Sequence, residues 1–136
     1  LNRTYEVGLA EMSVREKAGL LAYSPLACGY LSGKYRNNQM PKNSRLALFK
    51  GWERMINPLA MKAYDEYYKL AKENELTMVQ LAQAFVNSRP FVTSNIIGAT
   101  TMAQLKENIE SINIELSEEI MEKINLIHNN NPNPSP

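Results

Sequence analysis

The feature that most constrains the fold is a pattern that occurs twice: a short apolar strand, a turn of small residues and then, directly or after a loop, a helix. It is found in LLAYSPLACGYLSGKY, residues 20–35, and in FVTSNIIGATTMAQLKENIESI, residues 91–112. Strands are predicted over residues 20–23 and 92–97, because both runs are apolar or β-branched and end near a proline or a glycine. Strands that alternate with helices pair in parallel, and helices cover both faces of a parallel sheet. The sequence therefore predicts an α/β protein in which these strands are only part of a sheet.

Helices are predicted on either side of the strands. The opening residues 1–19 are expected to be helical until Gly19 ends the helix. From Pro58 to about residue 76, apolar residues recur at spacings of three and four, which indicates a helix with one apolar stripe. Thr77 and Gln80 then form a capping box, in which each side chain satisfies a free backbone N–H at the start of the next helix.

Two further helix starts follow the second strand. Thr101 and Gln104 form a second capping box, and Ser117 is the predicted cap of the last helix. The sequence ends in NNNPNPSP, a composition typical of a segment without regular structure. We therefore expect one folded unit over residues 1–128 and a flexible tail over residues 129–136.

The connection between residues 29 and 57 is predicted to be long and irregular, because glycine, asparagine and proline interrupt any period. It carries Lys34, Arg36, Lys42 and Arg45. Loops of this length in compact domains are often functional, and this series of cations favours a lid over an anion. A solvated charged loop explains these residues equally well.

Charge and cysteine content exclude several function classes. Fifteen basic and fourteen acidic side chains give a net charge of +1, so we expect neither nucleic acid nor a membrane surface as a partner. No apolar run approaches the roughly 20 residues of a membrane span. The single cysteine, Cys28, has no partner for an internal disulfide or a CxxC metal site, and a reducing cytoplasm is the expected location.

The repeated turn pattern suits an anionic ligand. A helix that begins directly after a strand presents free amides and the positive end of its dipole. Two such turns side by side form a site for phosphate or pyrophosphate. Small residues between positions 24 and 33 let a phosphate-bearing ligand approach the backbone, and Lys34 adds positive charge.

LLAYSPLACGYLSGKY and SNIIGATTMAQLKENIESI resemble the aldo-keto reductases, most closely a bacterial branch, and the similarity covers essentially the whole chain. The resemblance implies a (β/α)8 TIM barrel with an NADP(H) cofactor across the carboxyl ends of its strands. Because such a barrel has roughly 250 residues, this chain would be its C-terminal part: the end of the sixth strand, the sixth helix, and the seventh and eighth strand–helix units. The family's catalytic Asp, Tyr, Lys and His lie on earlier strands, so we assign no catalytic residue and no metal ligand.

The same resemblance implies where the cofactor would be held. The ring of Tyr23 would stack on the nicotinamide. The loop over the pyrophosphate would consist of Ser24, Pro25, Leu26, Ala27 and Cys28, with Lys34 and Arg45 as cationic partners. The turn at the adenosine 2′-phosphate would be Gly98, Ala99 and Thr100, and the helix face at the phosphate, ribose and adenine would be Gln104, Glu107 and Asn108.

The residues alone support part of this assignment. Positions 100, 104, 107 and 108 share one side of a helix. Taken without the resemblance, however, Gln104 is equally a capping residue and Asn108 a surface amide. The turn from Gly98 to Thr101 offers hydroxyls and amides but no cation, which weakens the implied preference for NADPH over NADH.

Two functions are therefore expected from the sequence. The first is the cofactor-binding C-terminal portion of an NADP(H)-dependent oxidoreductase that reduces an aldehyde or ketone by hydride transfer, with the small carbonyl compound as substrate of the intact protein. The second is a non-catalytic fragment that binds nucleotide weakly or self-associates as a homo-oligomer through its open sheet edges.

Overall fold

The computed structural model describes residues 1–49, 51 and 55–135. Its two strands, β1 (Leu20–Tyr23) and β2 (Val92–Ile96), pair in parallel to form a two-stranded sheet, with Leu20 opposite Val92 and Tyr23 opposite Ile96. The predicted strands and their parallel pairing are confirmed, and β2 ends one residue earlier than expected. Each strand has one neighbour, so its other edge is unpaired within the described residues.

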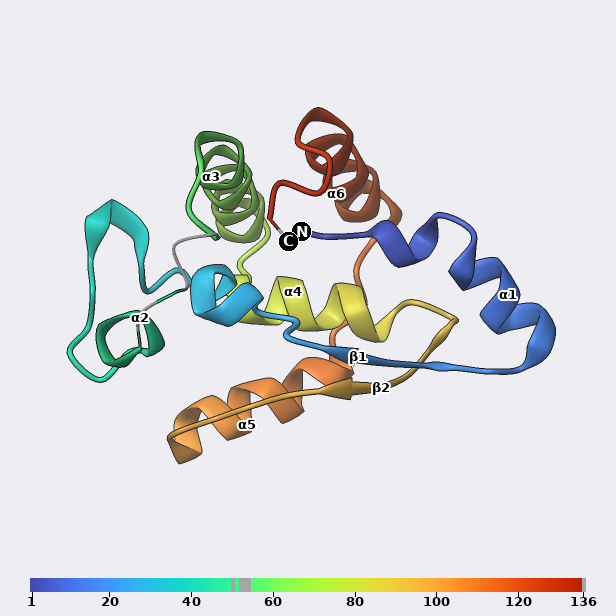
Figure 1. Cartoon of the computed structure of the whole chain (residues 1–136), viewed down its shortest axis with the longest axis horizontal. Helices are drawn as coiled ribbons and strands as arrows, with labels where there is room; N and C mark the ends of the chain where they lie inside the picture. The colour runs from blue at the N-terminus through green and yellow to red at the C-terminus, as the bar shows by residue number, and fades with distance from the viewer. Residues whose placement is uncertain (50, 52–54, 136) are drawn as a thin grey trace.

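In the view of Figure 1 the helices lie above and below the strand pair. Those that precede β2 are α1 (Leu9–Glu16), α2 (Arg45–Leu48), α3 (Pro58–Glu73) and α4 (Met78–Asn87); those that follow it are α5 (Met102–Glu110) and α6 (Glu118–Asn130). Helices α3 and α6 lie side by side, and α4 lies between them and the strands. Helix α5 contacts α4 and lies on the opposite side of the strands from α3 and α6 in this view.

The predicted helix starts are largely confirmed. The Thr77 hydroxyl accepts from the Gln80 N–H at 3.0 Å and the Gln80 side chain accepts from the Thr77 N–H at 2.9 Å, which completes the capping box of α4. Ser117 caps α6 through the Ile120 N–H. The opening helix is shorter than predicted, because a 3-10 turn over residues 4–6 precedes α1.

The core lies between the helices rather than on the sheet. The ring of Tyr30 stacks on that of Tyr64 with centroids 5.0 Å apart and contacts Tyr35 at the same distance. All three rings are buried, together with the apolar stripe of α3 that the spacing predicts. By contrast, Leu21 and Ile96 are each about half exposed, so one side of the sheet has no apolar cover within the described ranges.

The long connection after β1 is more ordered than predicted. A 3-10 segment over residues 27–32, another over residues 36–38 and the short helix α2 interrupt it. Tyr30 and Tyr35 belong to the core, so the first part of the connection packs instead of remaining in solvent. Residues 50 and 52–54 of the predicted loop lie outside the described residues.

The C-terminal segment is packed, which corrects the predicted flexible tail. Helix α6 continues to residue 130, and the buried side chain of Asn131 donates to Glu66 of α3 at 2.8 Å. The Asn57 side chain donates to the Pro134 carbonyl at 2.7 Å, and Ser135 is 2% exposed. These polar partners on α3 fix a segment whose composition alone is typical of disorder.

No helix in the described parts of the chain has the length and apolar character required to span a membrane.

Candidate functional site

Two loops leave the same edge of the sheet. Tyr23 and Ile96 are opposite one another at the carboxyl ends of β1 and β2. Because the strands are parallel, the segments that follow them, residues 24–28 and 97–101, begin next to each other (Figure 1). The structure therefore brings together the two turn regions that the sequence predicts as a ligand site.

The loop after β1 has an unusual backbone. Ser24, Ala27 and Cys28 have φ values of +54°, +47° and +57°. These values lie in the left-handed region, which residues other than glycine rarely adopt. Backbone hydrogen bonds hold this shape: the Ala27 N–H donates to the Ser24 carbonyl at 2.9 Å, and the Gly29 N–H donates to the Leu26 carbonyl at 2.8 Å. Backbone held in this region is found preferentially at ligand sites.

The side chains of this loop divide between solvent and core. The ring of Tyr23 is 80% exposed, so its face is open to a planar ligand. Ala27 is buried, and Leu26 packs against the core cluster. Cys28 is a half-buried free thiol that also contacts this cluster. The loop thus offers mainly backbone and one aromatic ring, as expected where a ligand approaches the main chain.

A cavity of about 590 Å³ lies beside β1, between the N-terminal segment and α4. Most of its walls are apolar core side chains such as Leu81, Phe85 and Ile124. Part of its rim is formed by the predicted site residues Tyr23, Ser24, Pro25, Ala27 and Cys28. The apolar walls suit an uncharged ring or a further strand better than a phosphate.

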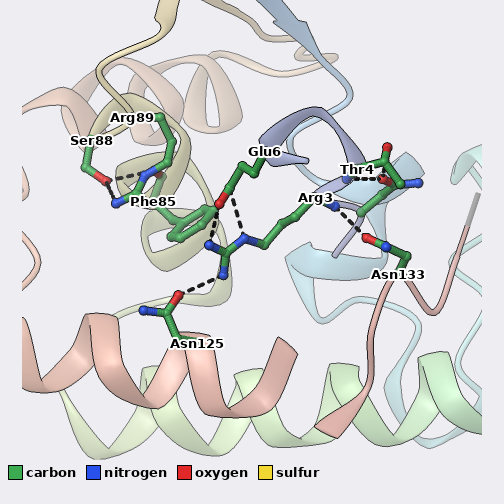
Figure 2. Close-up of polar contacts among 9 residues, drawn as sticks. Arg3, Thr4, Glu6, Phe85, Ser88, Arg89, Asn125 and Asn133 are labelled. Atoms are coloured by element: carbon green, nitrogen blue, oxygen red, sulfur yellow. Dashed lines mark hydrogen bonds and ion pairs between the residues drawn. The ribbon is translucent and has the colours of Figure 1, made fainter. Parts of the chain in front are cut away.

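Charged residues line part of this cavity, and Figure 2 shows their polar contacts. The Arg3 guanidinium donates to Glu6 at 2.9 Å and to the Asn125 side chain of α6 at 2.8 Å. The guanidinium carbons of Arg3 and Arg89 lie 5.2 Å and 4.8 Å from the Phe85 ring centroid, and burial lowers the pKa of Arg89. Glu6 neutralises Arg3, and this cluster attaches the N-terminal segment to α4 and α6.

The loop after β2 is held by side-chain hydrogen bonds. The Gln104 side-chain oxygen accepts from the Thr100 N–H at 2.9 Å and from the Thr100 hydroxyl at 3.0 Å. The Thr101 hydroxyl caps α5 by accepting from the Gln104 N–H at 3.2 Å. One hydrogen bond of the predicted capping box is present, from the Gln104 N–H to the Thr101 hydroxyl. In place of the other, the Gln104 side chain accepts from the N–H of residue 100 and not from that of residue 101.

Glu107 and Asn108 do not share an exposed face with Gln104. Glu107 accepts from the Thr77 hydroxyl of α4 at 2.7 Å. Asn108 is 6% exposed, and its side chain lies between Gln83 and the Gly98 carbonyl. Asn108 is therefore not the surface amide that the residues alone allow, because Gln83 of α4 provides a buried hydrogen-bond partner for it.

Sequence reasoning missed Thr77 and Gln83 as part of this region. Thr77 was predicted only as a helix cap, and its hydroxyl also contacts Glu107. Gln83 is 1% exposed and lies four residues after the buried Val79 of α4. A glutamine on the apolar face of a helix is the signal that would have identified it.

Two cations of the long connection contact a ring of the connection and an acid of α3. The Lys34 amine is 5.1 Å from the Tyr35 ring centroid and borders a separate hollow that includes Thr77. Arg36 pairs with Asp65 of α3 at 3.2 Å. Arg45 is exposed at the first position of α2.

The residues at the sheet edge fit a phosphate-bearing ligand. A Cβ added at Gly98 would meet no atom within 4 Å, so the backbone there is open to an approaching group. Ala99 and Thr100 are exposed, and the N-terminus of α5 follows with its free amides. Within the ranges that the structure describes, no three His, Cys, Asp or Glu side chains gather as metal ligands would.

Comparisons with known proteins agree with this architecture. Residues 1–129 match the sequence profile of the Aldo/keto reductase family. The chain is 46% identical over 136 residues to protein tas of Escherichia coli K12, covering all of this chain and 39% of that protein. It is 35% identical over 130 residues to an aldo-keto reductase of Babesia bovis, covering 90% of this chain and 46% of that protein.

A solved structure shows the same fold. The glycerol dehydrogenase of Gluconobacter oxydans matches with a TM-score of 0.74 at 24% identity, over 99% of this chain and 41% of that one. The chain therefore spans about two fifths of the length of the curated relatives and of the structure that it matches.

Proposed function

The chain belongs to the aldo/keto reductase family, and we propose that it is the cofactor-binding C-terminal portion of an NADP(H)-dependent oxidoreductase that reduces aldehydes or ketones. The observation that carries this proposal is the meeting of two loops at the carboxyl edge of a parallel strand pair. In parallel α/β folds, ligands bind at that edge.

In this proposal β1 and β2 are the seventh and eighth strands of a (β/α)8 barrel, and α1 is its sixth helix. Their adjacency and parallel direction support the assignment. The earlier strands would belong to the remaining part of the parent protein, because the chain spans 39% of protein tas. The family's proton-donating tyrosine would lie in that part and not in this chain.

The chain's own residues would bind and orient NADP(H). When bound, the cofactor supplies the hydride that a carbonyl carbon accepts. The exposed ring of Tyr23 would support the nicotinamide, and the loop from Ser24 to Cys28, with its three left-handed residues, would face the pyrophosphate. The open turn from Gly98 to Thr100 would receive the adenosine 2′-phosphate at the N-terminus of α5.

Titration of NADPH fluorescence tests this proposal. We expect Arg45→Ala to weaken binding by roughly 1 to 3 kcal/mol, the contribution of a charge-assisted contact. Lys34→Ala is expected to do the same if the connection closes over the cofactor. Lys62→Ala on α3, which removes an exposed cation paired with Glu66, is the matched control and should bind like the wild type. Unchanged binding in both test variants would favour a solvated loop.

A second candidate function is a non-catalytic fragment that self-associates. It is favoured by the half-exposed Leu21 and Ile96 and by the unpaired strand edges. We expect the purified chain to reduce no carbonyl, tested with 4-nitrobenzaldehyde and NADPH, and to form an oligomer in light scattering. Measurable NADPH oxidation by the chain would contradict the fragment function. A compact monomer that unfolds cooperatively would contradict self-association through the strand edges.

A further inference from the structure

A series of side-chain amides connects α4 and β2 to the turn at Gly98. Asn95 Nδ2 donates to Asn87 Oδ1 at 3.0 Å and to Gln83 Oε1 at 2.7 Å. Gln83 Nε2 donates to Asn108 Oδ1 at 3.2 Å, and Asn108 Nδ2 donates to the Gly98 carbonyl at 3.3 Å. We refer to the side chains of Asn87, Asn95, Gln83 and Asn108 as the amide relay.

Gln83 is the central member of the amide relay and its most buried one. It is 1% exposed, and the largest by volume of the fully buried side chains among the described residues. A buried amide without hydrogen bonds destabilises the fold by a few kcal/mol, whereas an apolar side chain of similar size avoids that cost. Gln83 therefore contributes hydrogen bonds with a fixed direction, which a leucine at this position would not.

The direction of the amide relay is set at Gly98. A backbone carbonyl can only accept, so Asn108 must turn its Nδ2 toward Gly98 and its Oδ1 toward α4. Gln83 must then donate with Nε2, which leaves its Oε1 to accept from Asn95. Reversing any one amide would place two acceptors or two donors face to face.

We propose that Gln83 is a positioning residue for the adenosine half of the cofactor site. It acts through Asn108, which holds Gly98 at one end of the exposed turn, while Gln104 holds Thr100 at the other. Loss of the Gln83 amide frees Asn108 to rotate and releases the Gly98 end of the turn. This inference rests on the proposed function, which places the 2′-phosphate at the same turn.

Binding of 2′,5′-ADP, a probe for the adenosine half, tests the role of Gln83. Calorimetric titration of the Gln83→Leu variant should give a dissociation constant about tenfold above that of the wild type, as expected for one lost hydrogen bond. Asn131→Leu is the matched control, because it removes a buried amide that contacts Glu66 of α3 and not the amide relay. It should lose stability and keep the affinity. Equal affinity of Gln83→Leu and the wild type would overturn the proposal.

The Gln83→Glu variant separates positioning from simple filling of space. An ionised carboxylate has only acceptors, so it draws Asn108 Nδ2 away from Gly98; a protonated carboxyl reproduces the donor and acceptor of the amide. Burial raises the pKa of such a carboxyl. The ratio of variant to wild-type dissociation constants should therefore fall toward one between about pH 8 and about pH 5. A ratio that stays well above one throughout this pH range would contradict the positioning role.

Backbone NMR in the absence of nucleotide tests the amide relay independently of the proposed function. If the wild type does not bind 2′,5′-ADP, the proposed function fails, and the amide relay is judged by the resonances of Gly98, Ala99 and Thr100. These amide signals should shift in Gln83→Leu and remain in place in Asn131→Leu. Unshifted turn signals in Gln83→Leu would overturn the amide relay itself.

Discussion

The two loops at the carboxyl edge of the sheet begin from the same sequence pattern and are held in different ways. The loop after β1 adopts left-handed backbone at Ser24, Ala27 and Cys28 and leads directly into the buried Tyr30. The loop after β2 remains exposed from residue 98 to residue 100. Gln104 and Asn108 of α5 hold it by hydrogen bonds. The first loop is fixed by its own backbone hydrogen bonds and by the packing of Tyr30, and the second by side-chain hydrogen bonds from α5.

Because of this difference, substitutions in the first loop should mainly affect stability, and substitutions in the second should mainly affect the geometry of the ligand site. A change in the first loop disturbs the tyrosine cluster that forms the core, so it should be detected mainly as a loss of folding free energy. A change in the second loop leaves the core intact and should mainly alter where the turn lies. The same pattern of strand and small-residue turn thus fulfils two different physical roles.

The largest expected difference between the loops comes from Tyr30→Ala. Its ring packs against both Tyr35 and Tyr64, so truncation should lower the free energy of unfolding by about 3 to 5 kcal/mol. Thr100→Ala in the other loop should change it by less than about 0.5 kcal/mol. Urea denaturation followed by circular dichroism measures both. Similar losses in the two variants would mean that both loops are packed alike.

An intermediate effect is expected from replacing one glycine in each loop. Gly29 has a φ of +99°, and a Cβ there would lie 2.9 Å from Lys34 Cε and 3.3 Å from Tyr35 Cε2. Gly29→Ala should therefore cost about 1 to 2 kcal/mol. Gly98→Ala, where a Cβ meets no atom within 4 Å, should be nearly neutral. Thermal unfolding of the two variants side by side checks this, and a neutral Gly29→Ala would remove the distinction between the backbones.

A third and smaller loss of stability sharpens the role of the second loop. Thr101→Ala removes the N-cap of α5 and should cost about 1 kcal/mol. Thr101→Ser keeps the hydroxyl and should restore most of the stability. Helix content and denaturant midpoint of the two variants are the measurements. A loss in Thr101→Ala well above 2 kcal/mol would show that this loop also supports the core.

Much of the fold could be predicted from local patterns. The apolar stripe after Pro58 predicts the buried face of α3, since helical period decides which residues meet the core. The Thr77 capping box is equally local, because its partners are three residues apart. The packed C-terminal segment could not be predicted in this way: Asn131 is held by Glu66, 65 positions earlier in the sequence.

In the candidate site, too, some features follow from the local sequence and others depend on residues far away in the chain. The turn at Gly98 and the exposed ring of Tyr23 follow from the strand ends, which the sequence marks clearly. The burial of Asn108 depends on Gln83, 25 residues away on another helix, and no local period contains that information. The positions of Lys34 and Arg36 likewise depend on contacts with rings and acids that only the tertiary structure supplies.

The contact between the first and last segments has a topological consequence. The Arg3 N–H donates to the Asn133 side chain at 2.8 Å and the Asn2 side chain donates to the Ser135 carbonyl at 3.4 Å, so residues 2–3 lie beside residues 133–135. A short linker could therefore join the ends into a ring, with new termini opened in the exposed stretch of residues 37–43. Because Ser135 is 2% exposed, a polypeptide fused after this segment would have to displace packed side chains before it reached the surface.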